Sequence, residues 1–323
     1  MIGVLCMKVV YGLENLTSPF KNAVVAVGNF DGVHLGHQAI FSEVRNKAAQ
    51  IEGTKVAITF EPHPIRVLNH REPPPLITLL EQKLELIEKQ QMDAVVCISF
   101  NHDFASISAR AFVEDVLVKT IGMKAIVIGP DYVFGKNRQG NVGYLKTEAL
   151  RLGFEVIVPR WIAMKGSLPE RISSTRVREI IQSGNVAYAR NLLGRYYQLR
   201  GTVSPGRRRG GRQLGFPTAN IQLDDELCPR QGVYAVTVEI EQGTFMGVAN
   251  IGYSPTFDDY LFTVEVHILD FEGDLYGKPI RVNFIERIRD EIKFSGIDEL
   301  AAQIGRDVET GRKILAGVVS PCL

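Results

Sequence analysis

The chain has 323 residues, with 37 lysines and arginines against 36 aspartates and glutamates, so its formal net charge is +1. This balance argues against a dedicated nucleic-acid coat protein, whose affinity would depend on many basic contacts to phosphate. A hydrophobic content of 45% and a charged content of 23% are typical of a globular protein and exclude a disordered one. The length predicts about two domains.

Four cysteines are scattered along the chain without a CxxC pair, so they indicate neither a zinc site nor a disulfide scaffold. The start of the chain is apolar but lacks the basic region and the small-residue cleavage site of a secretion signal. No apolar run approaches the roughly 18 residues of a membrane-spanning helix. We therefore expect a cytoplasmic protein without a membrane segment.

In the first half of the chain, short apolar runs alternate with amphipathic stretches. The runs have the length of strands that are buried on both faces: 23–28, 55–60, 94–100, 124–129 and 155–158. Helical patterns lie between them at 38–50, 78–91 and 108–121, and the second opens with a capping box of Thr78 and Glu81. This alternation predicts an α/β domain with a parallel sheet covered by helices on both faces.

The second half has a different pattern, which follows a helical stretch at about 174–193. Short alternating runs bounded by glycine, proline and aspartate occupy 232–241, 244–250, 261–270 and 279–287. This spacing predicts an antiparallel barrel or sandwich. A last amphipathic stretch at about 297–315 predicts a terminal helix that packs on it.

The even charge balance hides three unequal blocks. Residues up to 180 hold 21 basic and 18 acidic side chains, whereas residues 224–323 hold nine basic and 18 acidic ones. Between Glu179 and Asp224 there are seven arginines and no acidic residue. These blocks indicate a boundary near residue 185, which gives domains 1–184 and 185–323. The basic segment between the blocks is either an anion site or a solvated loop.

The sequence GNFDGVHLGH at 28–37 lies where the first strand ends and the first helix begins. At this junction of an open α/β sheet, the free N–H groups of the helix start favour anions. His34 and His37 are three residues apart around Gly36, so both imidazoles can point at one phosphate group. Zinc ligation or simple capping is the alternative interpretation, but no third metal ligand is visible nearby.

This motif resembles the signature of the nucleotidylyltransferase superfamily and, more narrowly, the FMN adenylyltransferase module of bacterial bifunctional riboflavin kinase/FAD synthetases. Three further blocks are similar to blocks of that family: TFEPHP at 59–64, IGPDYVFG at 128–135 and RISSTRVR at 171–178. Each block lies just past a strand end or at a helix start, where a ligand would bind. The resemblance implies a Rossmann-like nucleotidylyltransferase domain that transfers the adenylyl group of ATP to FMN.

The resemblance also implies roles for individual residues. In adenylyl transfer the attacking phosphate is already anionic, so charge stabilisation matters more than a general base. The catalytic residues implied for this step are His34, His37 and Arg171. Those implied for ATP binding are Gly28, Phe30, Asp31, Gly36, Ser174 and Thr175. Those implied for flavin placement are His63, Arg66, Phe104, Asp131 and Tyr132, with Phe134 as further ring cover. Aromatic residues near strand ends are, however, more often core than ligand cover.

A second constellation begins at residue 201. Gly201-Thr202-Val203, followed by further glycines and by GRQLGFPTAN at 211–220, resembles the riboflavin kinase signature. The residues implied for ATP binding are Gly201, Gly206, Gly211 and Arg212. Thr218 and Asn220, two apart on an extended segment, can direct two oxygens toward one Mg²⁺. The alternative is a structural glycine-rich turn before a strand, and Arg207, Arg208 and Arg209 make this loop more basic than is usual in the family.

The block GVANIG at 247–252 and the stretch around Glu265 extend the resemblance. The 5′-hydroxyl of riboflavin is a poor nucleophile, so a carboxylate near it is useful as a base or orienter. The position in the family gives this role to Glu265, unless Glu265 is an edge-strand residue that faces solvent. Together the modules imply a riboflavin kinase and FMN adenylyltransferase that uses Mg²⁺, ATP, riboflavin and FMN. We expect no nucleic-acid or membrane partner, and a monomer or weak homo-oligomer.

Two other functions remain as alternatives. A nucleotidylyltransferase for another phosphorylated acceptor, with a non-catalytic barrel, would explain the first motif, but the PTAN and Glu265 blocks argue against it. A flavin-binding or nucleic-acid-binding regulator would use the arginines at 207–212. Against this, the chain shows no helix-turn-helix, RRM or aromatic stacking run.

Overall fold

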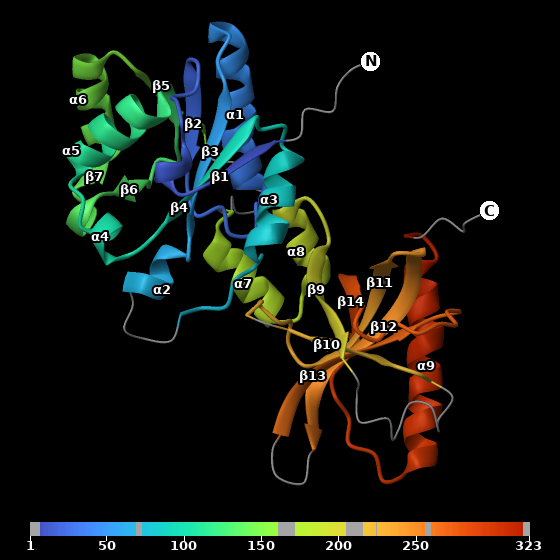
Figure 1. Cartoon of the computed structure of the whole chain (residues 1–323). Helices are drawn as coiled ribbons and strands as arrows, with labels where there is room; N and C mark the ends of the chain where they lie inside the picture. The colour runs from blue at the N-terminus through green and yellow to red at the C-terminus, as the bar shows by residue number, and fades with distance from the viewer. Residues whose placement is uncertain are drawn as a thin grey trace, which may run out of the picture. The chain divides into compact units, whose positions relative to one another are not determined.

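The computed structural model consists of two compact units, Met1–Ser174 and Thr175–Leu323 (Figure 1). The residues that it describes are 7–68, 73–160, 172–204, 216–223, 225–255 and 260–318, with the backbone alone for 253–255 and 260–262.

The two units divide earlier in the chain than the boundary expected at 184/185. The helix α7 (Ser174–Gln182) begins at the division, and the turn that follows it packs on the second unit. There Gly184 lies against the side chains of Arg287 and Tyr234, so that a Cβ at this position would be 2.8 Å from Arg287 Cδ. Residues 175–184 therefore belong with the unit that follows them.

The first unit contains a six-stranded sheet in which every neighbouring pair of strands is parallel. The five strands expected from the apolar runs are confirmed. The sixth, of four residues, was not expected from the sequence. From edge to edge the order is β1 (Lys8–Tyr11), β4 (Ala94–Ser99), β3 (Lys55–Glu61), β2 (Ala23–Val27), β5 (Met123–Val127) and β8 (Glu155–Ile157).

Helices cover both faces of this sheet, as expected. The helical segments are η1 (Leu13–Asn15), α1 (Leu35–Ile51), α2 (Pro64–Leu68), α3 (Leu80–Glu88), α4 (His102–Ala105), α5 (Ala109–Ala111), the π-helix η2 (Phe112–Ile121), η3 (Lys136–Arg138) and α6 (Val142–Leu152). α1 and α3 share one hydrophobic core with Val24, whereas η2 and α6 share the other with Val25. Successive strand residues serve opposite faces because side chains alternate along a strand.

The capping box predicted at Thr78 and Glu81 is wrong. Helix α3 begins at Leu80, its N-cap is Leu79, and no side chain bonds to the cap. The Thr78 hydroxyl instead accepts a hydrogen bond from the backbone N–H of Gly32, at 3.1 Å. Thr78 therefore contacts the loop between β2 and α1 rather than its own helix.

A short hairpin that the sequence pattern did not predict follows β5. It consists of β6 (Val133–Phe134) and β7 (Gly140–Asn141). The connection contains η3, in which Asn137 and Arg138 have left-handed φ angles of 57° and 58°. Its strands have only two residues each, too few for a hydrophobic period to be recognised.

The second unit contains a closed barrel whose strand pairs are all antiparallel, which decides between barrel and sandwich. The four strands expected between residues 232 and 287 are confirmed, and β9 was missed. Around the barrel the order is β10 (Ala219–Gln222), β13 (Tyr260–Ile268), β12 (Gly243–Pro255), β11 (Gly232–Ile240), β14 (Pro279–Arg289) and β9 (Tyr197–Ser204).

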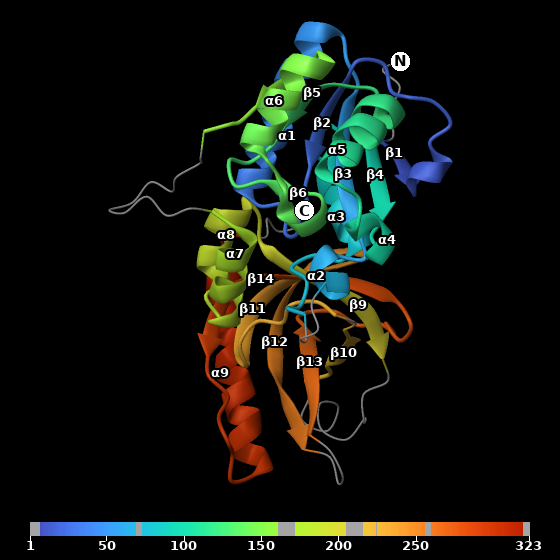
Figure 2. The same ribbon diagram turned by 90° about the vertical axis from the view of Figure 1, so that its left-hand side faces the viewer.

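Helices precede and follow the barrel strands along the chain. The stretch expected to be helical at 174–193 forms α7 and a second helix, α8 (Val186–Leu193), because Gly184 has a φ of 85° and Asn185 caps α8. The terminal helix α9 (Ile297–Leu315) is confirmed and packs on β11, β12 and β14 (Figure 2). Within the described ranges, no helix combines the length and the apolar character needed to cross a bilayer.

Candidate active sites

The loop between β2 and α1 has an unusual backbone. Phe30, Gly32 and Val33 all have positive φ, at 49°, 83° and 38°. A positive φ is strained for a β-branched residue such as Val33 and persists only where the surroundings hold it in place. Both Phe30 and Val33 are fully buried, so packing contributes to holding this loop.

Hydrogen bonds from other segments also fix this loop. The Asp31 carboxylate is buried and accepts from the backbone N–H groups of Ile77 and Thr78, at 3.0 and 3.1 Å. The Thr59 hydroxyl donates to the carbonyl of Asn29 at 3.2 Å, and the Ser174 hydroxyl donates to the carbonyl of Asp31 at 2.9 Å. The carboxylate of Asp31, which the sequence suggested for ATP, is thus turned toward the segment before α3.

The two histidines of the motif stack at the start of α1. His34 is the N-cap residue, and its Nδ1 accepts from the backbone N–H of His37 at 3.3 Å. Their rings are nearly parallel, with centroids 3.7 Å apart. Gly36 makes room for this arrangement, because a Cβ there would be 3.1 Å from the His34 ring. The pair therefore lies at a helix start whose N–H groups favour anions.

The environment of His37 keeps its imidazole neutral near pH 7. Burial, followed by the proximity of His34 and Lys83, lowers the pKa of His37 well below its ordinary value. Its Nδ1 is buried and has no hydrogen-bond partner among the residues that the structure describes. A buried polar atom without a partner is costly, so this nitrogen is available for a ligand that enters from the adjoining cavity.

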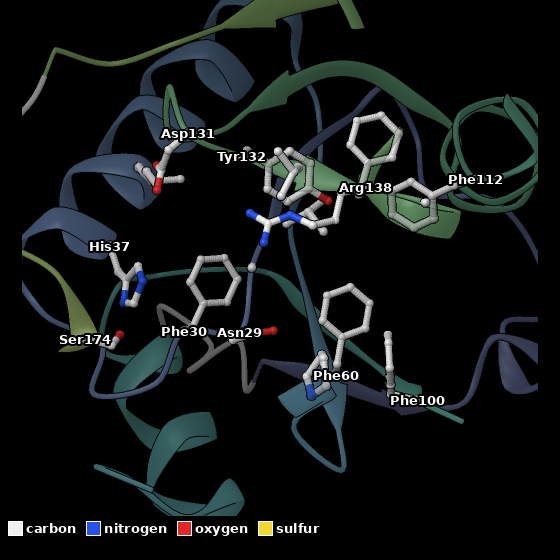
Figure 3. A pocket seen from close by; sticks show the side chains of 18 of the residues that line it. Asn29, Phe30, His37, Phe60, Phe100, Phe112, Asp131, Tyr132, Arg138 and Ser174 are labelled. Carbon is white, nitrogen blue, oxygen red and sulfur yellow. The ribbon is translucent and has the colours of Figure 1, made fainter. Parts of the chain in front are cut away.

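A cavity of about 880 Å³ opens beside the histidines, within the first unit (Figure 3). One end is formed by His34, His37 and Ser174, close to the start of α1. The other end is lined by aromatic rings that touch one another in sequence: Phe60, Phe100, Phe104, Phe112 and Phe134. The cavity thus joins a site suited to anions to an apolar site suited to a flat ring system.

The cavity brings together most of the residues expected in the first unit. Gly28, Phe30, His34, Gly36, His37, Phe104, Asp131, Tyr132, Phe134 and Ser174 all line it. The Tyr132 ring stacks on Phe134 with centroids 5.4 Å apart, and burial raises the pKa of Tyr132 above its ordinary value. Thr175 is exposed and does not line the cavity, and Arg171 lies outside the described residues.

The two residues expected at the end of β3 do not line the cavity. His63 is buried, and its Nδ1 accepts from the backbone N–H of Ile65 at 3.2 Å, in the first turn of α2. Arg66 lies on α2, and its Nε and Nη2 atoms are buried. The structure therefore places both beside α2 rather than in the cavity wall.

Several wall residues were missed by the sequence reasoning, among them Asn29, Phe60, Phe100 and Arg138. Asn29 and Phe60 lie inside recognised blocks, where a polar or aromatic residue at a strand end was the available signal. Arg138 lies in the unpredicted hairpin. Its only signal was the basic, glycine-bounded run GKNRQG at 135–140.

A row of polar residues crosses three strands of the barrel in the second unit. Glu265 on β13 is the register partner of Asn220 on β10 and of Asn250 on β12. Its neighbours Val264 and Val266 are buried, whereas Glu265 is half-buried on the opposite face of the strand. Glu265 is therefore flanked by two amide side-chain residues. Asn250 lies inside the GVANIG block and was not among the expected site residues.

The segment before β10 lies over this row. Pro217 O is 2.8 Å from His267 Nδ1, and the Phe216 ring meets the His267 ring edge to face. The Thr218 side chain forms a hydrogen bond with Glu265. Burial raises the pKa of Glu265, and the hydrogen bond from Thr218 lowers it by a smaller effect. Glu265 thus lies in contact with the FPTAN segment rather than free in solvent.

The remaining candidates of the second unit are only partly described. A Cβ at Gly201 would be 2.4 Å from the carbonyl oxygen of Gln222, so this glycine permits the close approach of β9 and β10. Gly206, Gly211 and Arg212 lie outside the described residues, as do the arginines at 207–209. No cluster of three histidine, cysteine or acidic side chains suited to a metal occurs within the described ranges.

Comparison with known proteins assigns the chain to a family. A family model described as FAD synthetase matches residues 17–176, and one described as riboflavin kinase matches residues 193–315. The bifunctional riboflavin kinase/FMN adenylyltransferase of Haemophilus influenzae is 38% identical over 95% of this chain and 98% of its own length. The chain belongs to the bifunctional riboflavin kinase/FMN adenylyltransferase family.

A second member agrees with this assignment, and a solved structure with a different title shares the fold over nearly the whole chain. The riboflavin kinase/FMN adenylyltransferase of Escherichia coli K12 is 37% identical over 98% of this chain and its own full length. A crystal structure described as a macrolide-efflux protein from Streptococcus pneumoniae is 32% identical, with a TM-score of 0.86, over 95% of this chain and 99% of its own. The cavity lies within the part matched by the FAD synthetase model, and the Glu265 row within the riboflavin kinase part.

Proposed function

We propose that the cavity of the first unit is the site where FMN is adenylylated to FAD. The observation that supports this best is the cavity itself, which connects the stacked histidines at the start of α1 with a chain of aromatic rings. ATP phosphates would lie at the histidine end, and the flavin ring at the aromatic end. A cavity of about 880 Å³ is large enough for two such ligands in contact.

In adenylyl transfer the protein contributes mainly by stabilising charge on the phosphates. A phosphate oxygen of FMN bonds to the α-phosphorus of ATP, and the bond from that phosphorus to pyrophosphate breaks. His34 and His37 hold the phosphate oxygens that gain charge, and a neutral His37 does so as a hydrogen-bond donor. Arg171, Ser174 and Thr175 act on the β- and γ-phosphates. Asp31 supports the loop through its carboxylate, while Gly28, Phe30 and Gly36 shape the ATP end.

Flavin placement is proposed for the wall of the aromatic end. Phe104 and Tyr132 cover the ring, and Asp131 at the rim orients the polar part of the nucleotide. Arg66 acts from α2 and His63 from the residue before it, outside the wall itself. Their part is to support the segment that follows β3, since their side chains do not line the cavity.

We propose that the Glu265 row carries riboflavin phosphorylation in the second unit. Glu265 orients the 5′-hydroxyl and accepts its proton, which suits a carboxylate whose pKa is raised by burial. The oxygens of Thr218 and Asn220 fit Mg²⁺, because this ion prefers hard oxygen ligands and takes the rest from phosphates and water. When bound, Mg²⁺ would neutralise phosphate charge. Gly201, Gly206, Gly211 and Arg212 would form the ATP loop.

The partners, oligomeric state and compartment that we propose follow from the same chemistry. Both reactions use small, soluble substrates, so neither nucleic acid nor membrane is needed as a partner, and the enzyme acts as a monomer or weak homo-oligomer. Cys97 and Cys228 are free thiols, which is in keeping with a reducing compartment such as the cytoplasm. The domain limits expected from charge, 1–184 and 185–323, differ from the division between the units only over residues 175–184, and of the residues given a role here only Thr175 lies in that interval.

Product analysis tests both proposed activities in one mixture. The full chain is incubated with riboflavin and Mg·ATP, and the flavins are separated and identified over time. FMN is expected first and FAD second. If riboflavin alone is recovered, the proposed function is wrong.

Two single substitutions test how the activities are divided. Glu265→Ala is expected to lower FMN formation by about 10²–10⁴-fold and to leave the conversion of added FMN to FAD unchanged. His37→Ala is expected to lower FAD formation by about 10²–10³-fold and to leave riboflavin phosphorylation unchanged. Loss of both activities in either folded variant would contradict separate sites.

A further inference from the structure

Arg138 reaches into the cavity from a turn that the recognised motifs do not include. Its side chain extends from η3 toward the middle of the cavity as drawn in Figure 3. His37 and Ser174 lie on one side of it, and Phe60 and Phe100 lie on the other. Arg138 thus occupies the junction between the anion end and the aromatic end of the cavity.

The turn that carries Arg138 is held in a strained conformation. Asn137 and Arg138 both have left-handed φ angles, which asparagine tolerates but which cost roughly 1–2 kcal/mol for a side chain such as that of arginine. Gly135 precedes them and lies against Ala109, where a Cβ would be 2.7 Å from Ala109 Cα. The backbone N–H of Lys136 donates to the carbonyl of Ile107 at 2.8 Å. Strain that the surroundings maintain in this way often marks a functional site.

The charges around the cavity indicate a role for Arg138. Adenylyl transfer brings two phosphate-bearing substrates together, but His37 is neutral because its pKa is lowered by burial. The Arg138 guanidinium forms no hydrogen bond or ion pair with any residue that the structure describes. A guanidinium is always charged and can bind two phosphate oxygens at once through its fork of N–H donors.

We propose that Arg138 binds the 5′-phosphate of FMN and holds it for attack on the α-phosphorus of ATP. This phosphate connects to the flavin ring at the aromatic end and must meet ATP at the histidine end, so it must pass the position of Arg138. The same contact selects FMN over riboflavin, which has no phosphate. The inference rests on the proposed adenylylation of FMN in the first unit.

Steady-state kinetics of FAD formation from FMN and ATP test this role in the full chain. Arg138→Gly removes the guanidinium but suits the left-handed backbone, so the turn keeps its shape. We expect kcat/KM for FMN to fall about 10- to 100-fold, with KM for ATP within about twofold of the wild type. Arg138→Lys keeps the charge without the fork and is expected to lose about tenfold or less.

Controls separate this contact from a structural effect. Gln139→Ala alters the same turn next to Arg138 but removes no cavity residue, and it is expected to keep the wild-type kcat/KM for FMN. The riboflavin kinase activity of every variant serves as an internal standard for active protein. An unchanged KM for ATP shows that the first unit is folded.

Three outcomes would overturn either the role inferred for Arg138 or the proposed function of the first unit. If Arg138→Gly keeps the wild-type kcat/KM for FMN, Arg138 does not bind the substrate phosphate. If KM for ATP rises while KM for FMN is unchanged, the guanidinium binds ATP instead and the inference is wrong. If the wild-type protein itself forms no FAD from FMN, the proposed function fails before the variants are compared.

Discussion

At the residue scale, the histidine pair acts through position rather than charge. His37 is buried, stacked on His34 and neutral, so positive charge at the phosphates has to come from other groups, among which Lys136, Arg138 and Arg160 line the cavity. The motif made both histidines candidates from the sequence alone. Their protonation could not be read from it, because the pKa depends on burial and on Lys83, which is 46 positions further along the chain.

The lowered pKa of His37 predicts a pH dependence of stability. An unfolded histidine takes up a proton as the pH falls below about 6.5, whereas folded His37 resists protonation, so the native state loses stability in that range. The slope from one such group is at most about 1.4 kcal/mol per pH unit. His37→Gln removes this contribution. Urea unfolding at pH 7, 6 and 5 is expected to show a weaker loss for the variant, and equal losses would contradict the assignment.

At the element scale, the loop between β2 and α1 depends on the segment before α3. Thr78 was correctly expected to form a side-chain hydrogen bond, but its partner was predicted wrongly. Its hydroxyl was expected to cap α3, but it accepts the Gly32 N–H of a loop 46 residues earlier. Local patterns predict local hydrogen bonds well, whereas a tertiary partner becomes visible only in the folded chain.

Thr78→Val is therefore expected to impair adenylylation rather than to fray α3. The variant removes one hydrogen-bond acceptor from the strained loop at a cost of about 1 kcal/mol, and it loosens the residues that position His34. We expect FAD formation to slow about tenfold while riboflavin phosphorylation is unchanged. Thr78→Ser keeps the hydroxyl and is the matched control. A Val variant as active as the Ser variant would show that this bond does not position the loop.

Among the residues that the structure describes, two ion pairs join α9 to the rest of its unit, and one of the two is buried. Asp307 is 3% exposed and forms a two-pronged pair with Arg289 at 2.6–3.0 Å, whereas the Asp270–Arg312 pair is exposed. Asp307→Ala leaves a half-buried arginine without its carboxylate and is expected to destabilise the second unit by about 3–5 kcal/mol. Asp270→Ala is expected to cost about 1 kcal/mol or less. Thermal unfolding measures the loss of stability in each variant. Equal losses in the two variants would contradict the stronger contribution of the buried pair.

At the scale of the whole molecule, the near-zero net charge was the least informative number in the sequence. The uneven charge blocks and the change from helix–strand alternation to short strands were better guides to two units. The β6–β7 hairpin was missed because strands of two residues have no recognisable period. The cavity wall combines residues from six segments between positions 27 and 174, and sequence blocks could supply only those that lay inside a known motif.

Apart from Thr175, which begins the second unit, each set of described candidate residues belongs to its own unit, so the two activities are expected to work in separate molecules. Glu265→Ala alone is expected to make very little FMN from riboflavin, and His37→Ala alone is expected to make FMN but very little FAD. A mixture of the two variants is expected to make FAD from riboflavin after a lag, while free FMN accumulates to the level that the intact first unit can use. Added FMN should abolish the lag. A mixture that accumulates FMN without forming FAD would show that one chain must carry both residues, and that the two sites are not independent.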